Sequence, residues 1–100
     1  MAYKILVHPL AVEELERLRA YDQRRVVAAI EKRLEQQPAE PAGSRKCLVT
    51  LTPEFEHVPP VWELRVGDFR VFYDVDSTSQ VVHLRAIRRK TPLERTEDIT

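Results

Sequence analysis

Two arginines placed symmetrically about a short turn are the residues of this sequence best suited to do chemistry. The run Val61–Val75 holds two stretches of alternating apolar and polar residues around Gly67-Asp68, which is typical of a β-hairpin with a type II′ turn. In such a hairpin Arg65 lies directly opposite Arg70, on the same face of the sheet. The two guanidinium groups repel each other unless an anion lies between them or Glu63 neutralises the pair. The spacing therefore leaves two interpretations open: a solvated network of ion pairs, which is the usual state of surface charges, or a phosphate site.

Alternation along the hairpin assigns each side chain to one of two faces. One face is apolar and is predicted to be core: Trp62, Leu64, Val66, Phe69, Val71, Tyr73 and Val75. The opposite face is predicted to be exposed: Val61, Glu63, Arg65, Arg70, Phe72 and Asp74. On that face, Phe72 is the candidate for stacking on a nucleic-acid base.

A second group of cations lies near the end of the sequence. Four basic residues fall within six positions with no acid between them: Arg85, Arg88, Arg89 and Lys90. Sixteen basic and sixteen acidic residues give a net charge of zero, which excludes a uniformly basic nucleic-acid binder. A local basic patch still binds phosphate, and consecutive strands are usually neighbours in a sheet. We therefore expect this group to lie beside the hairpin arginines.

Other kinds of reaction have little support in the sequence. The histidines His8, His57 and His83 form no helical i,i+4 pair, and the single Cys47 allows neither an internal disulfide nor a cysteine-built zinc site. The motifs GxGxxG, P-loop, GxSxG and HExxH do not occur. We expect no metal and no cofactor. His8 and His83 are interpreted as packed structural residues, Cys47 as buried filler, and the role of His57 is left open.

Hydrophobic periodicity predicts the elements that hold these residues. The period is about 3.5 in the first part of the sequence and 2 after the loop that contains Gly43. The predicted order β-αα-ββββ is that of a single α+β domain, residues 1–100, with two helices on one face of an antiparallel sheet. The expected elements are a strand at Tyr3–Val7, helices from Pro9 and from Asp22 (as N-cap), and strands at Cys47–Leu51, Val61–Val66, Phe69–Val75 and Val81–Ile87. Because no apolar run reaches the length of a membrane span and no leader pattern opens the sequence, a cytoplasmic protein is expected.

The sequence resembles the RelE/ParE superfamily of bacterial toxin–antitoxin toxins along almost its whole length. The resemblance is carried by Tyr3-Lys4-Ile5, by His8-Pro9 with Glu14-Leu15, by the basic segment Ala86–Lys90, and above all by VWELRVGDFRVFYDVD. It implies a RelE-like fold and an antitoxin that wraps around the toxin and holds it inactive. RelE-like members are metal-independent endoribonucleases that cut mRNA in the ribosomal A site, by attack of a 2′-hydroxyl on the adjacent phosphate. ParE-like members share the fold but poison DNA gyrase.

The resemblance also assigns roles by position. Arg70 matches the arginine after the hairpin turn of the ribonucleases, Arg65 a basic residue on the strand before it, and Lys90 the catalytic arginine that ends the last strand. Cations held close to the phosphate supply the charge stabilisation that such a reaction needs. The remaining basic residues of the second group are assigned to binding RNA phosphate: Arg85, Arg88 and Arg89.

Two departures from the ribonuclease pattern concern proton transfer. Val61 and Glu63 stand where the best-known ribonucleases have two lysines, and Thr96 or its neighbours stand where they have a C-terminal tyrosine. Glu63 is then predicted to accept the proton, because a carboxylate beside two arginines stays ionised on the correct face. The alternative base is His83 or His57.

Three hypotheses about function follow from the resemblance. The first is a ribosome-dependent mRNA endoribonuclease that inhibits translation. The second, motivated by the missing lysines and tyrosine, is a gyrase inhibitor without catalytic residues. The third is a weak or degenerate toxin that acts mainly with its antitoxin in operon repression. The expected partners are a cognate antitoxin and mRNA in the ribosomal A site, and both a homodimer and a toxin–antitoxin hetero-oligomer are left open.

Overall fold

The predicted β-hairpin is present in the computed structural model, which describes residues 2–100. Strands β3 (Val61–Val66) and β4 (Phe69–Asp76) pair antiparallel with Arg65 opposite Arg70, as the sequence predicts. Gly67 has a φ of +56°, which the first central residue of a type II′ turn requires. A residue with a Cβ atom would be strained there, so the turn helps to fix the register of the hairpin.

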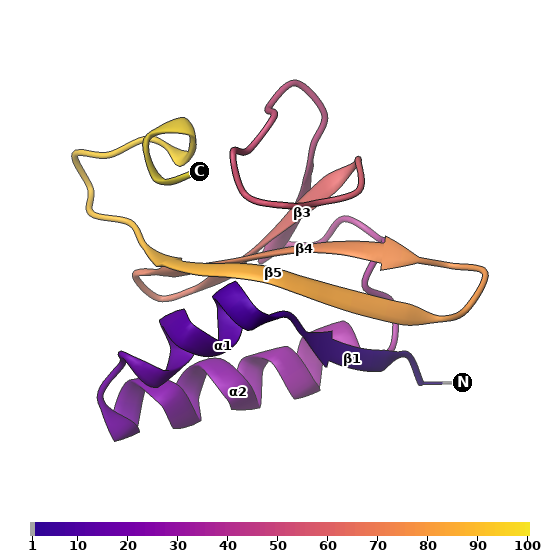
Figure 1. Ribbon diagram of the computed structural model, residues 1–100, viewed down its shortest axis with the longest axis horizontal. Helices are drawn as coiled ribbons and strands as arrows, with labels where there is room; N and C mark the ends of the chain where they lie inside the picture. The colour runs from indigo at the N-terminus through magenta and orange to yellow at the C-terminus, as the bar shows by residue number, and fades with distance from the viewer. Residues whose placement is uncertain (1) are drawn as a thin grey trace.

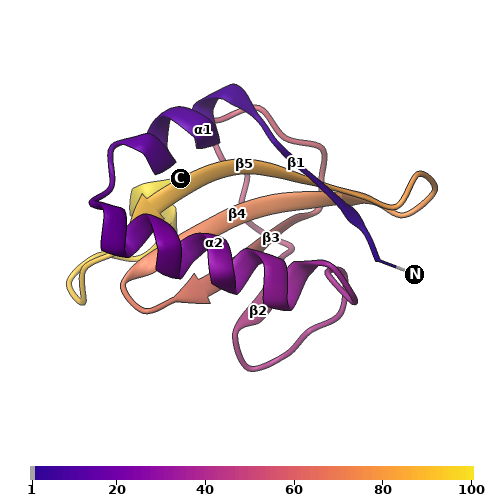
Figure 2. The same ribbon diagram turned by 90° about the horizontal axis from the view of Figure 1, so that it is seen from below.

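The hairpin is part of a five-stranded sheet. The other elements are β1 (Lys4–Val7), α1 (Pro9–Glu16), α2 (Ala20–Leu34), β2 (Arg45–Leu48), β5 (Val81–Arg89) and the 3₁₀ helix η1 (Thr96–Ile99). The order of strands across the sheet is β1-β5-β4-β3-β2 (Figures 1 and 2). The α+β class and the order β-αα-ββββ are thus confirmed. The sheet is antiparallel except for one pair of strands, since β1 runs parallel to β5.

Both helices cover one face of the sheet (Figure 2). Val26 and Leu34, at helical spacing on α2, are fully buried against the apolar face of the hairpin. This confirms the predicted core face, on which the rings of Trp62 and Tyr73 stack with centroids 6.4 Å apart. The Tyr73 hydroxyl donates a hydrogen bond of 2.7 Å to the carbonyl of Pro38, and burial raises the pKa of this phenol above its ordinary value.

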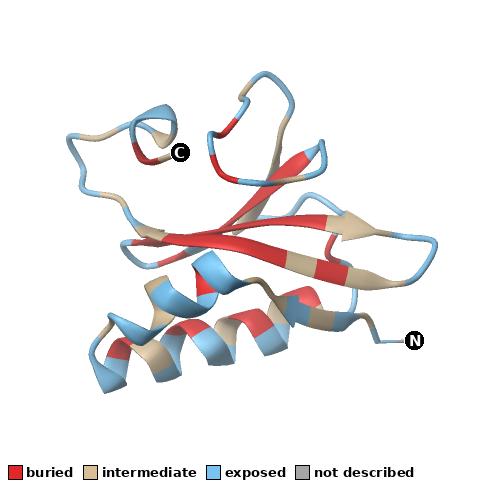
Figure 3. Cartoon of the chain, in the orientation of Figure 1, coloured by how far each residue is buried: buried red, intermediate tan, exposed pale blue. Residues whose placement is uncertain are grey.

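The opposite face of the hairpin is covered, contrary to the prediction that it is exposed. Glu63 and Asp74 are each only 3% exposed, and Phe72 is completely buried. The loop of residues 49–60 and the C-terminal segment lie over this face (Figures 1 and 3). Together they build a second core from Phe55, Val61, Phe72, Ala86 and Ile99. Phe72 therefore cannot stack on a base, and that prediction was wrong.

The second helix begins earlier than predicted. Arg19 is the N-cap of α2, so Asp22 lies in the first helical turn and not before it. A carboxylate in the first turn is favoured by the helix dipole, which explains an acid there without an N-cap role. Among residues 2–100, neither helix is long and apolar enough to cross a membrane.

Strand β2 is shifted relative to its predicted span of Cys47–Leu51. Its pairing with β3 begins at Arg45 and ends at Leu48, opposite Val61. Pro59-Pro60 come directly before β3 and have no N–H to donate, so the ladder cannot continue beyond this point. The shift brings residues 45 and 46 into the sheet.

Candidate functional site

Three arginines stand side by side on the three central strands of the sheet, close to the turn between β3 and β4. Arg65 on β3 is opposite Arg70 on β4, and Arg70 is opposite Arg88 on β5. We call these three residues the arginine row. The sequence predicted the first pair, and the register of β5 adds the third member. A row of like charges across adjacent strands is unfavourable unless anions compensate it, so the row defines the candidate site.

Arg70, in the middle of the row, is held in one position by several contacts. Its Nη1 donates hydrogen bonds to the carbonyls of Gly67 (2.8 Å) and Phe69 (3.0 Å), and its Nε lies 3.9 Å from Oε2 of Glu63. Only 12% of the side chain is exposed. A cation held in this way needs little reorganisation to stabilise charge that develops nearby. Arg65, in contrast, is exposed, and no carboxylate among residues 2–100 pairs with it.

Glu63 is the carboxylate nearest to the centre of the row. Its oxygens lie 3.6 Å from Nζ of Lys46 and 3.9 Å from Nε of Arg70, and they accept a hydrogen bond of 3.1 Å from the Thr96 hydroxyl. Lys46 was not found by the sequence analysis, although it is directly opposite Glu63 in the pairing of β2 with β3. The strand was predicted to begin one residue later, at Cys47, so Lys46 was assigned to the preceding loop.

A small cavity adjoins these groups. It has a volume of about 160 Å³ and is lined by residues 42–46 together with Glu63 and Arg65. A carboxylate thus lies at a cavity wall shared with a lysine and an arginine. This arrangement can bind a phosphate through its cations and accept a proton from a hydroxyl through its carboxylate.

The C-terminal segment covers the far end of the row. Nη1 of Arg88 donates a hydrogen bond of 2.9 Å to the carbonyl of Ile99, and its guanidinium also pairs with the carboxylate of Glu14 from α1. With the Thr96–Glu63 hydrogen bond, this contact ties η1 to both sides of Arg70. The site is therefore open mainly at Arg65 and Lys46, at the β2 side of the sheet.

Lys90 and Arg89, two other cations of the C-terminal group, lie in different places at the end of β5. The backbone N–H of Lys90 donates to the carbonyl of Asp68 (2.7 Å), which brings the end of β5 to the hairpin turn. Arg89 lies on the other side of the sheet, against the ring of Phe69. The group predicted as one patch is therefore divided between the two faces of the sheet.

Arg85 lies away from the arginine row. It is the extra residue of β5 where the pairing with β4 shifts between Phe72 and Tyr73. Its side chain is only 7% exposed, and it donates hydrogen bonds of 2.7 and 3.3 Å to the two oxygens of Asp74. A guanidinium held in this way has its donors already used, so the predicted role of Arg85 in binding RNA phosphate has no support in the geometry.

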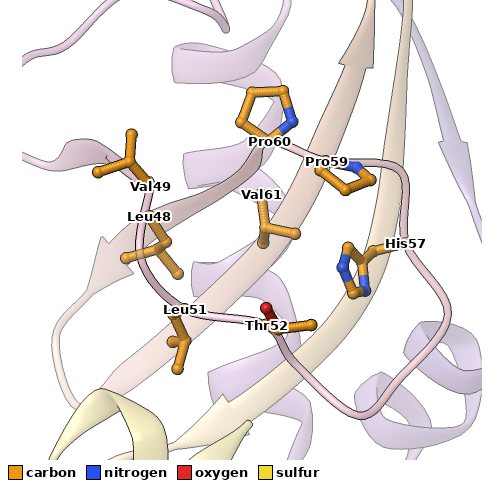
Figure 4. Close-up of a pocket in the computed structure, with 8 residues that line it drawn as sticks. All are labelled: Leu48, Val49, Leu51, Thr52, His57, Pro59, Pro60 and Val61. Carbon is orange, nitrogen blue, oxygen red and sulfur yellow. The ribbon is translucent and has the colours of Figure 1, made fainter.

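The two alternative bases also lie outside the row. Nδ1 of His57 donates a hydrogen bond of 2.8 Å to the carbonyl of Phe55, and the ring lines a cavity of about 360 Å³ together with Thr52 and apolar residues (Figure 4). His83 lies five residues before Arg88 along β5 and contacts His8. Among residues 2–100, no cluster of three histidine, cysteine, aspartate or glutamate side chains could hold a metal ion.

His8 and His83 form a hydrogen-bonded pair that joins the start of α1 to β5. Nε2 of His8 is 2.8 Å from Nδ1 of His83, and Nδ1 of His8 is 3.4 Å from Nη1 of Arg85. Since arginine only donates, His8 accepts at Nδ1 and donates from Nε2. Burial, the nearby Arg85 charge and His83 lower the pKa of His8, against smaller opposite effects of Asp74 and Glu56.

This pair predicts a loss of stability in mild acid. Because the pKa of His8 is lower in the folded protein than in the unfolded chain, unfolding takes up a proton below about pH 6.5. The resulting stability is complete above pH 6.5 and falls as the pH drops towards the folded pKa. Urea denaturation at pH 7.5 and 5.5 should show a smaller pH dependence for His8→Gln than for the wild type. A His8→Gln protein with the full pH dependence of the wild type would contradict this assignment.

Comparison with solved structures identifies proteins that have a similar fold. The chain is similar to the toxin–antitoxin complex RelBE2 of Mycobacterium tuberculosis (19% identity, 90% of this chain and 100% of that chain, TM-score 0.70). It is also similar to the RelE–RelB complex of Pyrococcus horikoshii (22% identity, 92% and 99%, TM-score 0.70). The isolated RelE toxin of Escherichia coli matches with 18% identity over 97% of this chain and 90% of that one, at a TM-score of 0.60. No curated protein matches the sequence.

The fold is thus that of the RelE-type toxins, as expected from the sequence. Residues 5–91 match the family model described as the ParE toxin of the type II toxin–antitoxin system parDE. The chain belongs to this family of toxins of toxin–antitoxin systems.

Proposed function

We propose that this toxin is a ribosome-dependent mRNA endoribonuclease that needs no metal ion. The observation that carries the proposal is the position of Glu63, at the wall of a small cavity and between the arginine row and Lys46. Cleavage of RNA without a metal needs a base for the 2′-hydroxyl and cations for the phosphate. These side chains supply both within one site.

In the proposed reaction Glu63 accepts the proton of the 2′-hydroxyl, whose oxygen attacks the adjacent phosphorus. Arg65 and Arg70 stabilise the negative charge that develops on the phosphate oxygens. The bond from phosphorus to the 5′-oxygen breaks, that oxygen takes a proton from Lys46 or Lys90, and a 2′,3′-cyclic phosphate remains. Lys46 on β2 thus supplies a lysine to the site, whereas the best-known ribonucleases carry two lysines on the strand that corresponds to β3.

Inhibition of DNA gyrase is the second candidate function. It is favoured by one observation at the same site: the Glu63 side chain is only 4% exposed and already contacts Lys46, Arg70 and Thr96. A carboxylate with three partners serves equally well to fasten the C-terminal segment to the sheet. In that case the arginine row binds a partner and does no chemistry. A weak toxin that acts mainly with its antitoxin is the third possibility.

Incorporation of labelled precursors after induced expression separates these functions. The ribonuclease predicts that methionine incorporation falls first, with cut mRNA appearing within minutes. A gyrase inhibitor predicts that thymidine incorporation falls first while translation continues. If neither falls in cells that accumulate folded protein, a weak toxin is the remaining explanation.

The antitoxin is proposed to occupy an apolar groove on the helix side. A cavity of about 290 Å³ lies between β1, α1 and α2 and is lined mainly by aliphatic side chains, including Ile5, Leu15 and Val27. Glu31 on α2 and Glu35, the C-cap of that helix, also line it. An amphipathic antitoxin helix with apolar residues on one face and lysine or arginine beside them fits this chemistry.

A charge in the groove should therefore weaken the toxin–antitoxin complex. Val27 is 37% exposed, so Val27→Asp can point its carboxylate to water in the free toxin but not in the complex. We expect the affinity for the antitoxin to fall about 10- to 100-fold, because an unpaired charge is buried on binding. The measurement is isothermal titration of purified toxin with antitoxin. Val12→Asp is the matched control, since Val12 on α1 is 39% exposed and lies outside the groove; an equal loss for both variants would contradict the proposed groove.

A further inference from the structure

A second pair of arginines lies on the helix side of the hairpin end. The guanidinium carbons of Arg25 on α2 and Arg89 on β5 are 5.6 and 5.0 Å from the centroid of the Phe69 ring. Phe69 is only 1% exposed, so its ring is a fixed support that holds both cations by cation–π contact. Their side chains remain 42% and 58% exposed and can be reached from solvent.

The nearby acid neutralises this pair only in part. The buried carboxylate of Asp22 lies 3.9 Å from Arg25 and 4.0 Å from Arg89, too far for hydrogen bonds. Nε of Arg19 is nearer, at 3.5 Å from a carboxylate oxygen of Asp22. One carboxylate thus faces three guanidinium groups, which leaves an excess of two positive charges. Asp22 helps to orient Arg25 and Arg89 but leaves their N–H donors available to a ligand.

Gly67 connects this pair to the arginine row on the other face. Its carbonyl accepts the hydrogen bond from Arg70, and a Cβ atom at this residue would lie 3.0 Å from Nη2 of Arg25. Only the backbone of the turn separates the two cations. The end of the hairpin therefore carries fixed arginines on both of its sides, with Asp68 as the acid of the turn between them.

We propose that Arg25 and Arg89 bind a second phosphate of a single-stranded RNA whose backbone passes around the Gly67-Asp68 turn from the arginine row. This inference rests on the proposed function and adds a positioning site outside the reacting phosphate. Two guanidinium groups on one support present paired N–H donors that match phosphate oxygens. An acidic protein segment is the competing ligand for the same donors.

The test is the affinity for RNA that cannot be cut. A labelled 2′-O-methyl oligonucleotide lacks the attacking hydroxyl, and its binding to the purified toxin can be followed by fluorescence anisotropy at several salt concentrations. Arg25→Gln and Arg89→Gln should each bind about tenfold more weakly. Each should also reduce the slope of log K against log salt by about 0.7, the value for one phosphate contact on a single strand.

Three further variants sharpen the test. Arg24→Gln removes the same charge from the neighbouring exposed position of α2, which lines a different surface with Val27 and Glu31, and it should leave the salt slope unchanged. Arg25→Lys keeps the charge and should recover much of the affinity. Asp68→Asn removes the acid at the turn and should strengthen binding. Thermal unfolding of every variant shows that it is folded under the conditions of the binding measurement.

The outcomes separate this inference from the proposed function. If Arg65→Gln weakens RNA binding while Arg25→Gln and Arg89→Gln do not, the second phosphate site alone is overturned. The second phosphate site is also overturned if Arg25→Gln and Arg89→Gln weaken only antitoxin binding, since the ligand would then be an acidic protein segment. If they weaken RNA binding in a toxin that cuts no mRNA, the phosphate site stands and the nuclease fails. A wild-type toxin that does not bind the oligonucleotide overturns the second phosphate site, and mRNA cleavage in a translating extract then tests the nuclease independently.

Discussion

Substitution of Arg70 by glutamine is expected to lower the rate of mRNA cleavage about 100- to 1000-fold in a protein that remains folded. Arg70 stands between the other two members of the arginine row, and its Nε points towards Glu63. Loss of one fixed donor to developing negative charge has effects of this size in other enzymes. Glutamine keeps an N–H₂ group that can donate to a turn carbonyl, so the hairpin should persist. Primer extension on mRNA from a translating extract measures the cleavage.

Two further variants test whether the lost cleavage comes from the chemistry of the site: one removes the proposed base, and the other is a surface control. Glu63→Gln retains an oxygen that accepts the hydrogen bond from Thr96 but removes the base, so it should also abolish cleavage while η1 stays in place. Arg17→Gln is the control, because Arg17, the C-cap of α1, is 72% exposed and among residues 2–100 forms an ion pair only with Glu13. Full cleavage by folded Arg70→Gln would contradict the ribonuclease. A toxin whose growth arrest survives both Arg70→Gln and Glu63→Gln, with thymidine incorporation stopped first, would act on gyrase.

The core of the fold and the first pair of site arginines were predictable because the deciding interactions are local. A two-residue turn beginning with glycine sets the pairing of its flanking strands, so Arg65 opposite Arg70 follows from the spacing alone. The same alternation correctly assigned Trp62 and Tyr73 to the core. Hydrophobic periodicity likewise predicted the order of elements, because a helix and a strand that each bury one face repeat their apolar residues at different periods.

The rest of the site depends on contacts between distant parts of the chain. Lys46 joins Glu63 only through the register of β2, and this register is set by where Pro59-Pro60 stop the pairing. The cover over the second face comes from η1 and the loop of residues 49–60, neither of which is periodic. The bulge that turns Arg85 towards Asp74 likewise has no pattern in the sequence of β5. The four cations of residues 85–90 are close in sequence, but the alternation and the bulge of β5 place their side chains on different faces of the sheet.

Replacement of Phe72 by alanine is expected to destabilise the protein by about 3–5 kcal/mol. Phe72 is completely buried, lies against the ring of Phe55 at 5.6 Å and belongs to the second core together with Ile99. A cavity of aromatic size under the C-terminal segment cannot be filled by collapse of such a small cluster. Urea denaturation measures the loss, and Val49→Ala, at an 81% exposed position, should change stability by less than about 0.5 kcal/mol.

The same variant tests whether the second core positions the site. Phe72 is directly opposite Glu63 on the neighbouring strand, and Ile99 joins it to the segment that carries Thr96. Loss of the ring should therefore loosen the Thr96–Glu63 hydrogen bond and expose Arg70, which faster amide exchange in residues 96–99 would reveal. Phe72→Leu keeps most of the apolar volume and should retain the slow exchange at a smaller loss of stability. If Phe72→Ala were instead as stable as the wild type and bound RNA more weakly, the ring would contact a base, and the second core would not be what holds the C-terminal segment over the arginine row.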